Sequence, residues 1–383
     1  MFKTPLLYLP GPTAVPDSIL RARMGPLMDD QALYKEISGA VQRILKTKSS
    51  VHILAGEGML ALDSVSCSLI EQGDSVLIIS NGVFGDWFLD LVGKYTSSYT
   101  VFQCSPTSGV SASALEEFLI AQEQKGVSFK LATLVHCDTP SGVLNDIASL
   151  VPVLSRHSIL SVVDVVASSF GVSIDLDLCG VDVALMGSQK ALSCPSGLSM
   201  LAISERAWRA METRRTPIPS YYCNLLLFKN APATFPYTVS SYDLLGLRDA
   251  LHLLEEEGLD NVYHRHMRIA EAVRYAVQKS GLTLYLVSDY SPTITAFHVP
   301  QGTTSDAILQ TMLNDYGIRF SSSLGSLDKK VMRIGHMGFN SNVPVVLYVL
   351  KCLTRTLRSH GVCLRDDMGE SFFERYHSMV EVE

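Results

Sequence analysis

The segment Ile159-Leu-Ser-Val-Val-Asp164 decides the fold class, because it is a short apolar run that ends on an acidic residue. A second apolar run, at residues 181–186, leads into Gly187-Ser-Gln-Lys190. Near-continuous apolar runs of this kind, separated by helical patterns, are typical of parallel strands that are covered on both faces. We therefore predict an α/β fold with a mostly parallel central sheet sandwiched by helices.

The pattern changes after Pro236, which indicates a second, smaller domain. Residues 242–280 have a long helical pattern, and shorter strands then alternate with helices, as in an α+β domain. We expect an N-terminal arm at 1–25, a large domain at 26–245, a small C-terminal domain at 246–365 and a tail at 366–383. The strands that we predict are 51–55, 76–80, 99–102, 131–136, 159–163, 181–186 and 198–203 in the large domain, and 282–287, 294–299 and 331–334 in the small one.

The bulk composition excludes several classes of protein. Hydrophobic residues make up 47% of the 383 residues and charged residues 18%, as in a well-packed globular enzyme. The net charge of −7 gives no electrostatic reason to expect nucleic acid as a partner. No apolar run is long enough to span a membrane. The eight cysteines form no C-x-x-C pair, so we expect reduced thiols and a cytoplasmic protein.

Two strand ends carry the residues on which the functional prediction depends. Ligands of parallel sheets bind at the carboxyl ends of the strands, where Asp164 and Lys190 lie. Pyridoxal 5′-phosphate (PLP) needs a lysine that bonds to it and a carboxylate that keeps its pyridine nitrogen protonated. Taken singly, Lys190 also fits a solvated loop lysine and Asp164 a helix cap. Together they predict a PLP site, in which we expect no metal.

Two other strand ends offer a ring contact and a phosphate site. Phe84 follows the strand at 76–80 and can stack on the cofactor ring, although an aromatic there also suits a plain core. The turn Gly56-Glu57-Gly58 precedes an apolar helix that begins near Met59. Free N–H groups at a helix N-terminus bind anions, although an ordinary tight turn explains the glycines equally well.

These residues belong to a longer ordered pattern. The chain resembles the class V aminotransferases of fold type I, which depend on PLP, and it is most similar to the alanine–glyoxylate (serine–pyruvate) and 2-aminoethylphosphonate–pyruvate aminotransferases. The resemblance runs from Leu9-Pro-Gly-Pro12 to about Leu357. Its motifs are Val163-Asp-Val-Val-Ala-Ser168, Gly187-Ser-Gln-Lys-Ala191, Ser80-Asn-Gly-Val-Phe-Gly85, His136-Cys-Asp-Thr-Pro-Ser-Gly-Val143, Leu245-Gly-Leu-Arg-Asp-Ala-Leu251 and Arg333-Ile-Gly-His-Met-Gly338.

The resemblance implies roles around the cofactor ring. Lys190 would form the Schiff base and move the α-proton, and Asp164 would pair with the pyridine nitrogen. Val166 would pack under the ring and Phe84 on its opposite face. Thr139 would lie in the loop that contacts the ring.

The resemblance also implies roles around the phosphate and the substrate. Gly58, Met59 and Gln189 would hold the phosphate. Thr238 would reach the phosphate of the neighbouring subunit, so that a homodimer shares its active sites. Arg333 would bind the substrate carboxylate through two hydrogen bonds, for which its planar guanidinium is suited.

The phosphate loop departs from the family pattern. Relatives place Ser-Gly-Thr or Ser-Gly-His where this chain has Glu57, Gly58 and Met59. At about 5 Å and an effective dielectric near 20, each pair of like unit charges repels by about 3 kcal/mol, whereas a helix-capping carboxylate stabilises by only about 1 kcal/mol. Either Glu57 points away from the phosphate, towards a cation or the substrate amine, and backbone amides hold the phosphate, or the cofactor binds weakly; we favour the first hypothesis. Phe235 also stands where relatives often have a phosphate-binding tyrosine.

The predicted function is that of an aminotransferase. It would move an amino group between a small amino acid, or an aminophosphonate, and a 2-oxo acid such as pyruvate or glyoxylate. The alternative is a PLP-dependent lyase, cyclase or other non-transaminating enzyme, because the same cofactor adduct supports those reactions. A third hypothesis is a cofactor-free binding or regulatory protein on the same fold, and the unusual phosphate loop is its support.

Overall fold

The computed structural model describes residues 4–26 and 28–380, and its largest element is a seven-stranded sheet. β10 is antiparallel to both of its neighbours, β2 and β9, and the other strands all run in one direction. The mostly parallel sheet is confirmed, and each strand predicted for it is present. Across the sheet the order is β2 (Ser50–Ala55), β10 (Leu198–Ile203), β9 (Val183–Gly187), β8 (Leu160–Asp164), β5 (Leu131–Val135), β3 (Val76–Ser80) and β4 (Tyr99–Gln103).

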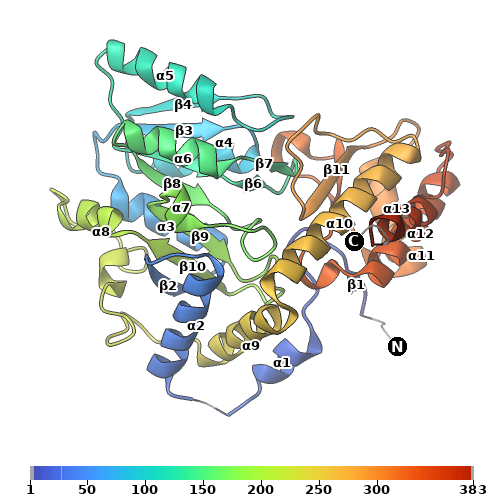
Figure 1. Ribbon diagram of the computed structural model, residues 1–383, viewed down its shortest axis with the longest axis horizontal. Helices are drawn as coiled ribbons and strands as arrows, with labels where there is room; N and C mark the ends of the chain where they lie inside the picture. Colours follow the sequence, from blue (N-terminus) through green and yellow to red (C-terminus); the bar gives the residue numbers. More distant parts are fainter. Residues whose placement is uncertain (1–3, 27, 381–383) are drawn as a thin grey trace.

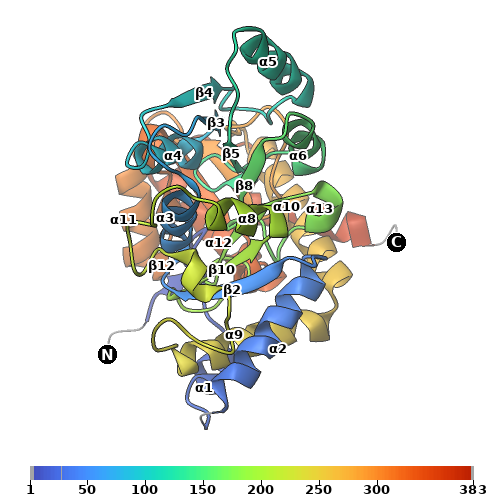
Figure 2. The ribbon, with the colours of Figure 1, turned by 90° about the vertical axis from the view of Figure 1, so that its left-hand side faces the viewer.

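Helices cover both faces of this sheet (Figure 1, and from the side in Figure 2). The side chains alternate along β8, where Val163 packs into one apolar cluster and Val162 into the other. The first cluster includes residues of α2 (Asp30–Ile44), α5 (Ala112–Gln124), α6 (Ile147–Arg156), α7 (Leu176–Cys179) and α9 (Ser241–Glu257). The second includes residues of α3 (Gly58–Leu69), α4 (Val83–Val92) and α8 (Glu205–Glu212).

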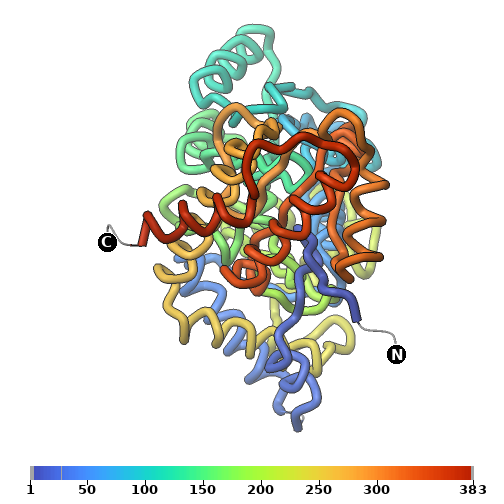
Figure 3. Tube along the Cα trace, turned by 90° about the vertical axis from the view of Figure 1, so that its right-hand side faces the viewer, coloured from blue at the N-terminus to red at the C-terminus, as the bar shows by residue number. Residues whose placement is uncertain are grey.

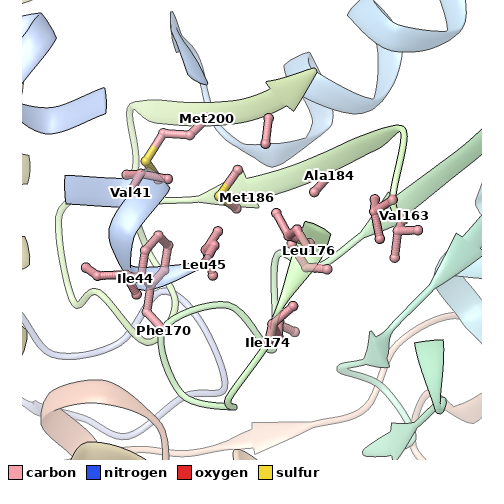
Figure 4. Close-up of a cluster of buried hydrophobic side chains, with 14 of the residues drawn as sticks. Val41, Ile44, Leu45, Val163, Phe170, Ile174, Leu176, Ala184, Met186 and Met200 are labelled. Carbon is pink, nitrogen blue, oxygen red and sulfur yellow. The ribbon is translucent and has the colours of Figure 1, made fainter. Parts of the chain in front are cut away.

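Figure 4 shows part of the first cluster, in which Val41, Ile44 and Leu45 lie near Met186 and Met200 of the sheet. Each of these side chains is at most 1% exposed. The strands are therefore apolar on both faces, which explains why their sequences read as continuous apolar runs rather than as alternating ones.

The C-terminal part forms a second core around a three-stranded sheet with the order β11 (Ile294–His298), β14 (Val331–Gly335) and β13 (Ser321–Ser322). The predicted long helix is interrupted at Gly258, whose φ of 83° separates α9 from α10 (Leu259–Lys279). The remaining helices are α11 (Ser305–Tyr316), α12 (Val343–Ser359) and α13 (Met368–Val380). α13 lies within the predicted tail and packs against α10 and α12, so we now propose that the small domain extends through it.

The prediction of a strand at 282–287 was wrong. Only an isolated bridge joins Leu284 to Phe297, and the N–H of Val287 donates instead to the carbonyl of Thr107 at 3.0 Å. The alternating leucines of this segment are buried, but their backbone does not follow one partner strand. The alternation of apolar residues therefore indicated that these side chains are buried, but not that the backbone pairs along a strand.

The N-terminal arm lies beside the C-terminal part of the chain (Figure 3). Its strand β1 (Leu6–Leu7) pairs in parallel with β12 (Ile318–Arg319), and the short helix α1 (Asp17–Ala22) follows. The arm thereby passes from β12 towards α9, which packs against α1.

Two further expectations concern the whole chain. All eight cysteines are free, as predicted. Among the described residues, no helix is both long and apolar enough to cross a membrane.

Candidate active site

A cavity of about 300 Å³ opens at the carboxyl ends of the sheet strands. It brings together eight of the ten predicted site residues, which come from five separate stretches of the chain. We call the side with Asp164, Val166, Phe84 and Lys190 the ring end, and the side with Glu57, Gly58, Met59 and Gln189 the phosphate end. The eight predicted residues that line the cavity are Gly58, Met59, Phe84, Thr139, Asp164, Val166, Gln189 and Lys190.

Asp164 is the last residue of β8, and its carboxylate is buried at the floor of the cavity. The N–H of Val166 donates to it at 2.8 Å. Burial raises the pKa of Asp164 to about 6, while the Val166 N–H and the nearby Lys190 charge oppose that rise. A buried carboxylate of this kind is stabilised by a cationic partner, and a protonated pyridine nitrogen is such a partner.

Lys190 follows β9 directly, and its Nζ donates to the carbonyl of Pro10 at 3.0 Å. Burial lowers the pKa of Lys190 to about 8, helped by the charge of Arg333 and opposed by Asp164. A lysine with a lowered pKa is partly neutral near neutral pH, so that it can act as a nucleophile and as a base.

Val166 and Phe84 both line the ring end. Val166 packs on the backbone of Gly58, where an added Cβ would lie 3.3 Å from its Cγ2. Phe84 meets Trp87 edge-on, with the ring centroids 4.9 Å apart. The ring end thus offers both aliphatic and aromatic contacts, which suit a flat heteroaromatic ring.

Asp138 holds the backbone of Phe84 in place, a role that we did not predict from the sequence. It is fully buried and accepts the N–H of Phe84 at 2.9 Å and the hydroxyl of Ser141 at 2.7 Å. A Cβ at Gly82 would clash with its carboxylate, which explains why a glycine precedes α4. Burial raises the pKa of Asp138, and these hydrogen bonds oppose the rise.

The phosphate end lies at the N-terminus of α3. Glu57 is the N-cap residue, but its side chain makes no capping hydrogen bond, and it is exposed while lining the cavity. The first backbone N–H groups of α3 therefore keep their capacity for an anion. Gln189 lines the same end, and its buried Oε1 has no partner among the described residues. The residues present fit PLP at the ring end, and the phosphate end offers backbone donors beside an acidic side chain.

Arg333 lies on β14 and does not line the cavity, but it is tied to a residue that does. Its Nη1 donates to the carbonyl of Thr139 at 3.4 Å, its Nη2 to the hydroxyl of Ser321 at 2.8 Å, and its Nε to the carbonyl of Ser322 at 2.9 Å. Burial lowers the pKa of Arg333 to about 10, and Asp138 opposes this. The guanidinium therefore stays charged at neutral pH behind the wall of the cavity.

Thr238 is the other predicted residue outside the cavity. It is exposed on a segment whose neighbour Tyr237 stacks on Tyr222, with the ring centroids 4.6 Å apart. Thr238 does not line this cavity. A contact between Thr238 and the phosphate bound by a second subunit therefore stays a prediction.

The sequence interpretation missed the part of the cavity that the N-terminal arm provides. Gly11 and Pro12 line it, and the only available signal was the Leu9-Pro-Gly-Pro12 motif, which has no chemically reactive side chain. The other unpredicted lining residues are Leu62, Trp87, Cys137, Ala167, Ser196 and Leu324.

The fold and this cavity define a fold type I PLP-dependent enzyme. The family model for "Aminotransferase class-V" matches residues 31–335, and the chain belongs to that family. The chain is 32% identical to the L-aspartate–glyoxylate aminotransferase of Paracoccus denitrificans, over 87% of this chain and 86% of that protein. It is 33% identical to the serine–glyoxylate aminotransferase of Arabidopsis thaliana, over 91% and 88%.

The solved structures agree with the sequence relatives. The crystal structure of pyridoxamine–pyruvate aminotransferase from Mesorhizobium loti superposes with a TM-score of 0.92 and 29% identity, over 98% of each chain. These relatives confirm the fold type I architecture and favour an aminotransferase over a lyase or a cofactor-free binding protein. The chain is a PLP-dependent aminotransferase.

Proposed function

We propose that the chain transfers an amino group from a small amino acid, or from an aminophosphonate, to glyoxylate or pyruvate. The observation that carries this proposal is the position of Arg333, a buried and charged guanidinium bonded to the Thr139 loop that lines the cavity. A guanidinium there suits a substrate with an α-carboxylate. The relatives named above take glyoxylate or pyruvate as their acceptors according to their names.

The residues of this chain divide the work of the reaction. When bound, PLP supplies an electron-withdrawing ring that stabilises negative charge at the substrate α-carbon. Asp164 would accept a hydrogen bond from the pyridine nitrogen and would keep that nitrogen protonated. Lys190 would provide the amine that holds the cofactor, and it would take up and return the proton of the substrate α-carbon. Val166 and Phe84 would contact the cofactor ring.

We further propose a cytoplasmic homodimer in which Thr238 of one subunit contacts the phosphate bound by the other. The exposed aromatic side chains of Tyr221 and Tyr222 near this segment support an interface at that position. Free cysteines support a reducing compartment.

A second candidate donor is favoured by the phosphate end. A carboxylate at Glu57 disfavours a dianion and accepts a hydrogen bond from a hydroxymethyl group, which pyridoxamine carries in place of the phosphate ester. A relative with a TM-score of 0.92 is named for a reaction between pyridoxamine and pyruvate. In this candidate function the amine nitrogen of pyridoxamine moves to pyruvate, giving pyridoxal and alanine.

One screen tests both candidates. The purified protein is mixed with single amino donors, and the absorbance of the bound cofactor is followed before any 2-oxo acid is added. Conversion to the amine form of the cofactor, reversed by glyoxylate or pyruvate, supports transamination, whereas return to the aldehyde form with loss of a substituent from the donor supports a lyase. A parallel assay supplies pyridoxamine and pyruvate without PLP and measures pyridoxal. Lys190→Ala is the inactive control for both arms.

A further inference from the structure

Lys190 is in contact with the N-terminal arm. Its Nζ donates to the Pro10 carbonyl at 3.0 Å, and no other hydrogen bond of this amine occurs among the described residues. This hydrogen bond orients the amine, which burial by itself would not do. The arm therefore contributes more to the site than the wall that Gly11 and Pro12 form.

Gly11 lies against the lysine side chain so closely that only a glycine fits. Its φ is +109°, and an added Cβ would lie 2.5 Å from Nζ and 2.7 Å from Cε of Lys190. Both the backbone conformation and the contact require a residue without a side chain. The glycine lets the carbonyl of the preceding residue reach the amine.

The arm is fixed to the segment that carries the lysine. The N–H of Thr13 donates to the carbonyl of Gln189 at 3.1 Å, and the Thr13 hydroxyl donates to the carbonyl of Lys190 at 3.0 Å. The same hydroxyl is 3.0 Å from Oγ of Ser193. Thr13 is fully buried, so these bonds form without competition from water.

The arm is also fixed to the strand that carries the proposed carboxylate site. A Cβ at Gly335 would lie 2.5 Å from Cα of Pro10, and Gly335 is two residues beyond Arg333 on β14. The side chain of Asn340 donates to the carbonyl of Leu9 at 3.3 Å. Pro10 is therefore enclosed between β14 on one side and Lys190 on the other.

We propose that the carbonyl of Pro10, with Gly11 and Thr13, is the resting position of the Lys190 amine while that amine is not bonded to the cofactor. A neutral carbonyl accepts an N–H whether the amine is charged or neutral, so it orients the amine in both protonation states. The arm is a positioning element: it acts on the reaction only through Lys190. It also contacts β14 at Gly335, two residues beyond Arg333. The inference rests on the proposed role of Lys190 in the reaction.

The test measures the titration of the amine itself. The full-length chain without PLP is treated with an amine-modifying reagent across pH 6–10 (about the range over which lysine amines with lowered pKa values titrate), and modification of the Lys190 peptide is quantified by mass spectrometry. The charged and titratable groups that influence Lys190 are Asp164, Arg333, Cys137 and Glu57. Because no turnover is measured, the result is independent of which substrates the enzyme accepts.

Gly11→Ala is the decisive variant. The new Cβ would lie 2.4 Å from Cδ and 2.5 Å from Nζ of Lys190, so the side chain must move away from the arm and into the cavity that it lines. Water in the cavity stabilises the charged amine, and we expect the midpoint of modification to rise by about one pH unit, a tenfold change in the neutral fraction at pH 7. The matched control is Gly73→Ala, where φ is +89° and nothing lies within 4 Å of the new Cβ. It should leave the midpoint unchanged.

Thr13→Val provides a second variant that adds no clash. It removes the hydroxyl that ties the arm to Lys190 and Ser193, and we expect a smaller shift of the midpoint in the same direction. An unchanged midpoint in Gly11→Ala, or an equal shift in Gly73→Ala, would overturn the proposal. If Gly11→Ala does not fold, an unchanged midpoint in Thr13→Val overturns it instead.

Discussion

At the ring end of the cavity two titratable groups are buried and bonded to backbone groups, whereas at the phosphate end the acidic side chain of Glu57 is exposed and makes no capping hydrogen bond. Asp164 accepts an N–H at 2.8 Å and Lys190 donates to a carbonyl at 3.0 Å. Glu57 caps α3 without a side-chain hydrogen bond. Hydrogen bonds to the backbone thus orient Asp164 and Lys190 without a ligand. The side chain of Glu57 has no such capping bond and can therefore interact with different ligands. We propose that the ring end carries the chemistry and that the phosphate end influences which cofactor or substrate form is bound.

The largest effect that we expect comes from removing the charge at the ring end. Asp164→Asn would leave the pyridine nitrogen without an anionic partner, and we expect kcat to fall by about 10²–10⁴-fold, the range typical of a lost acid–base contribution. Steady-state kinetics with saturating PLP measures this. A change of less than about tenfold would show that the ring end does not depend on its carboxylate, which would remove the contrast between the two ends.

The same substitution has an opposite effect on stability. The pKa of Asp164 is raised to about 6 in the folded chain, so the folded state binds its proton more tightly than the unfolded state. Stability is therefore lost as the pH rises from about 4 to about 6, and it stays lost above that. At pH 7.5, Asp164→Asn should stabilise the cofactor-free protein by about 3 kcal/mol, and at pH 4 most of the gain should disappear. Urea unfolding at the two pH values measures it; an equal gain at both would contradict a raised pKa.

The next largest effect is expected at Arg333, which we propose to bind the substrate carboxylate. Arg333→Lys would replace a planar fork with a single ammonium group and would break the bonds to Ser321 and Ser322. We expect kcat/KM for an amino acid to fall by about 10–100-fold, corresponding to charge-assisted hydrogen bonds of about 1.5–3 kcal/mol. Arg319→Lys, at an exposed arginine on β12, is the matched control. Equal losses for substrates with and without an α-carboxylate would show that Arg333 only supports the loop.

The contrast between the two ends also separates what the sequence could predict from what it could not. The seven strands of the large sheet were recognisable as apolar runs, and Asp164 and Lys190 were recognisable as chemically distinctive residues at the ends of two of them. The arm was not, because the contribution of Pro10 is a backbone carbonyl, which no residue type identifies. Asp138 was missed for a related reason: a buried aspartate that bonds the N–H of Phe84 leaves the same trace in a sequence as an ordinary turn residue.

Residues 282–287 show that an alternating apolar pattern does not by itself predict backbone pairing. Leu282, Leu284 and Leu286 alternate as in a strand and are all less than 10% exposed, yet the backbone pairs at Leu284 alone. Periodicity reports which side chains are buried. Whether the backbone finds a continuous partner depends on residues distant in the sequence, here Phe297 and Thr107.

The smallest effect, and the one that best sharpens the comparison, is expected at Glu57. Because this carboxylate is exposed, most of its repulsion of a phosphate dianion is screened by water. We expect Glu57→Ser to leave the affinity for PLP equal or to improve it by up to about tenfold, the equivalent of about 1.4 kcal/mol. Equilibrium titration of the cofactor-free protein with PLP and with pyridoxal gives the ratio of the two affinities, which should move towards PLP in the variant. Glu205→Ser, at an exposed acid in the first turn of α8, is the control and should change neither affinity. A large loss of PLP affinity in Glu57→Ser would mean that this carboxylate supports the phosphate end through another residue, and the two ends would then be equally fixed by the fold.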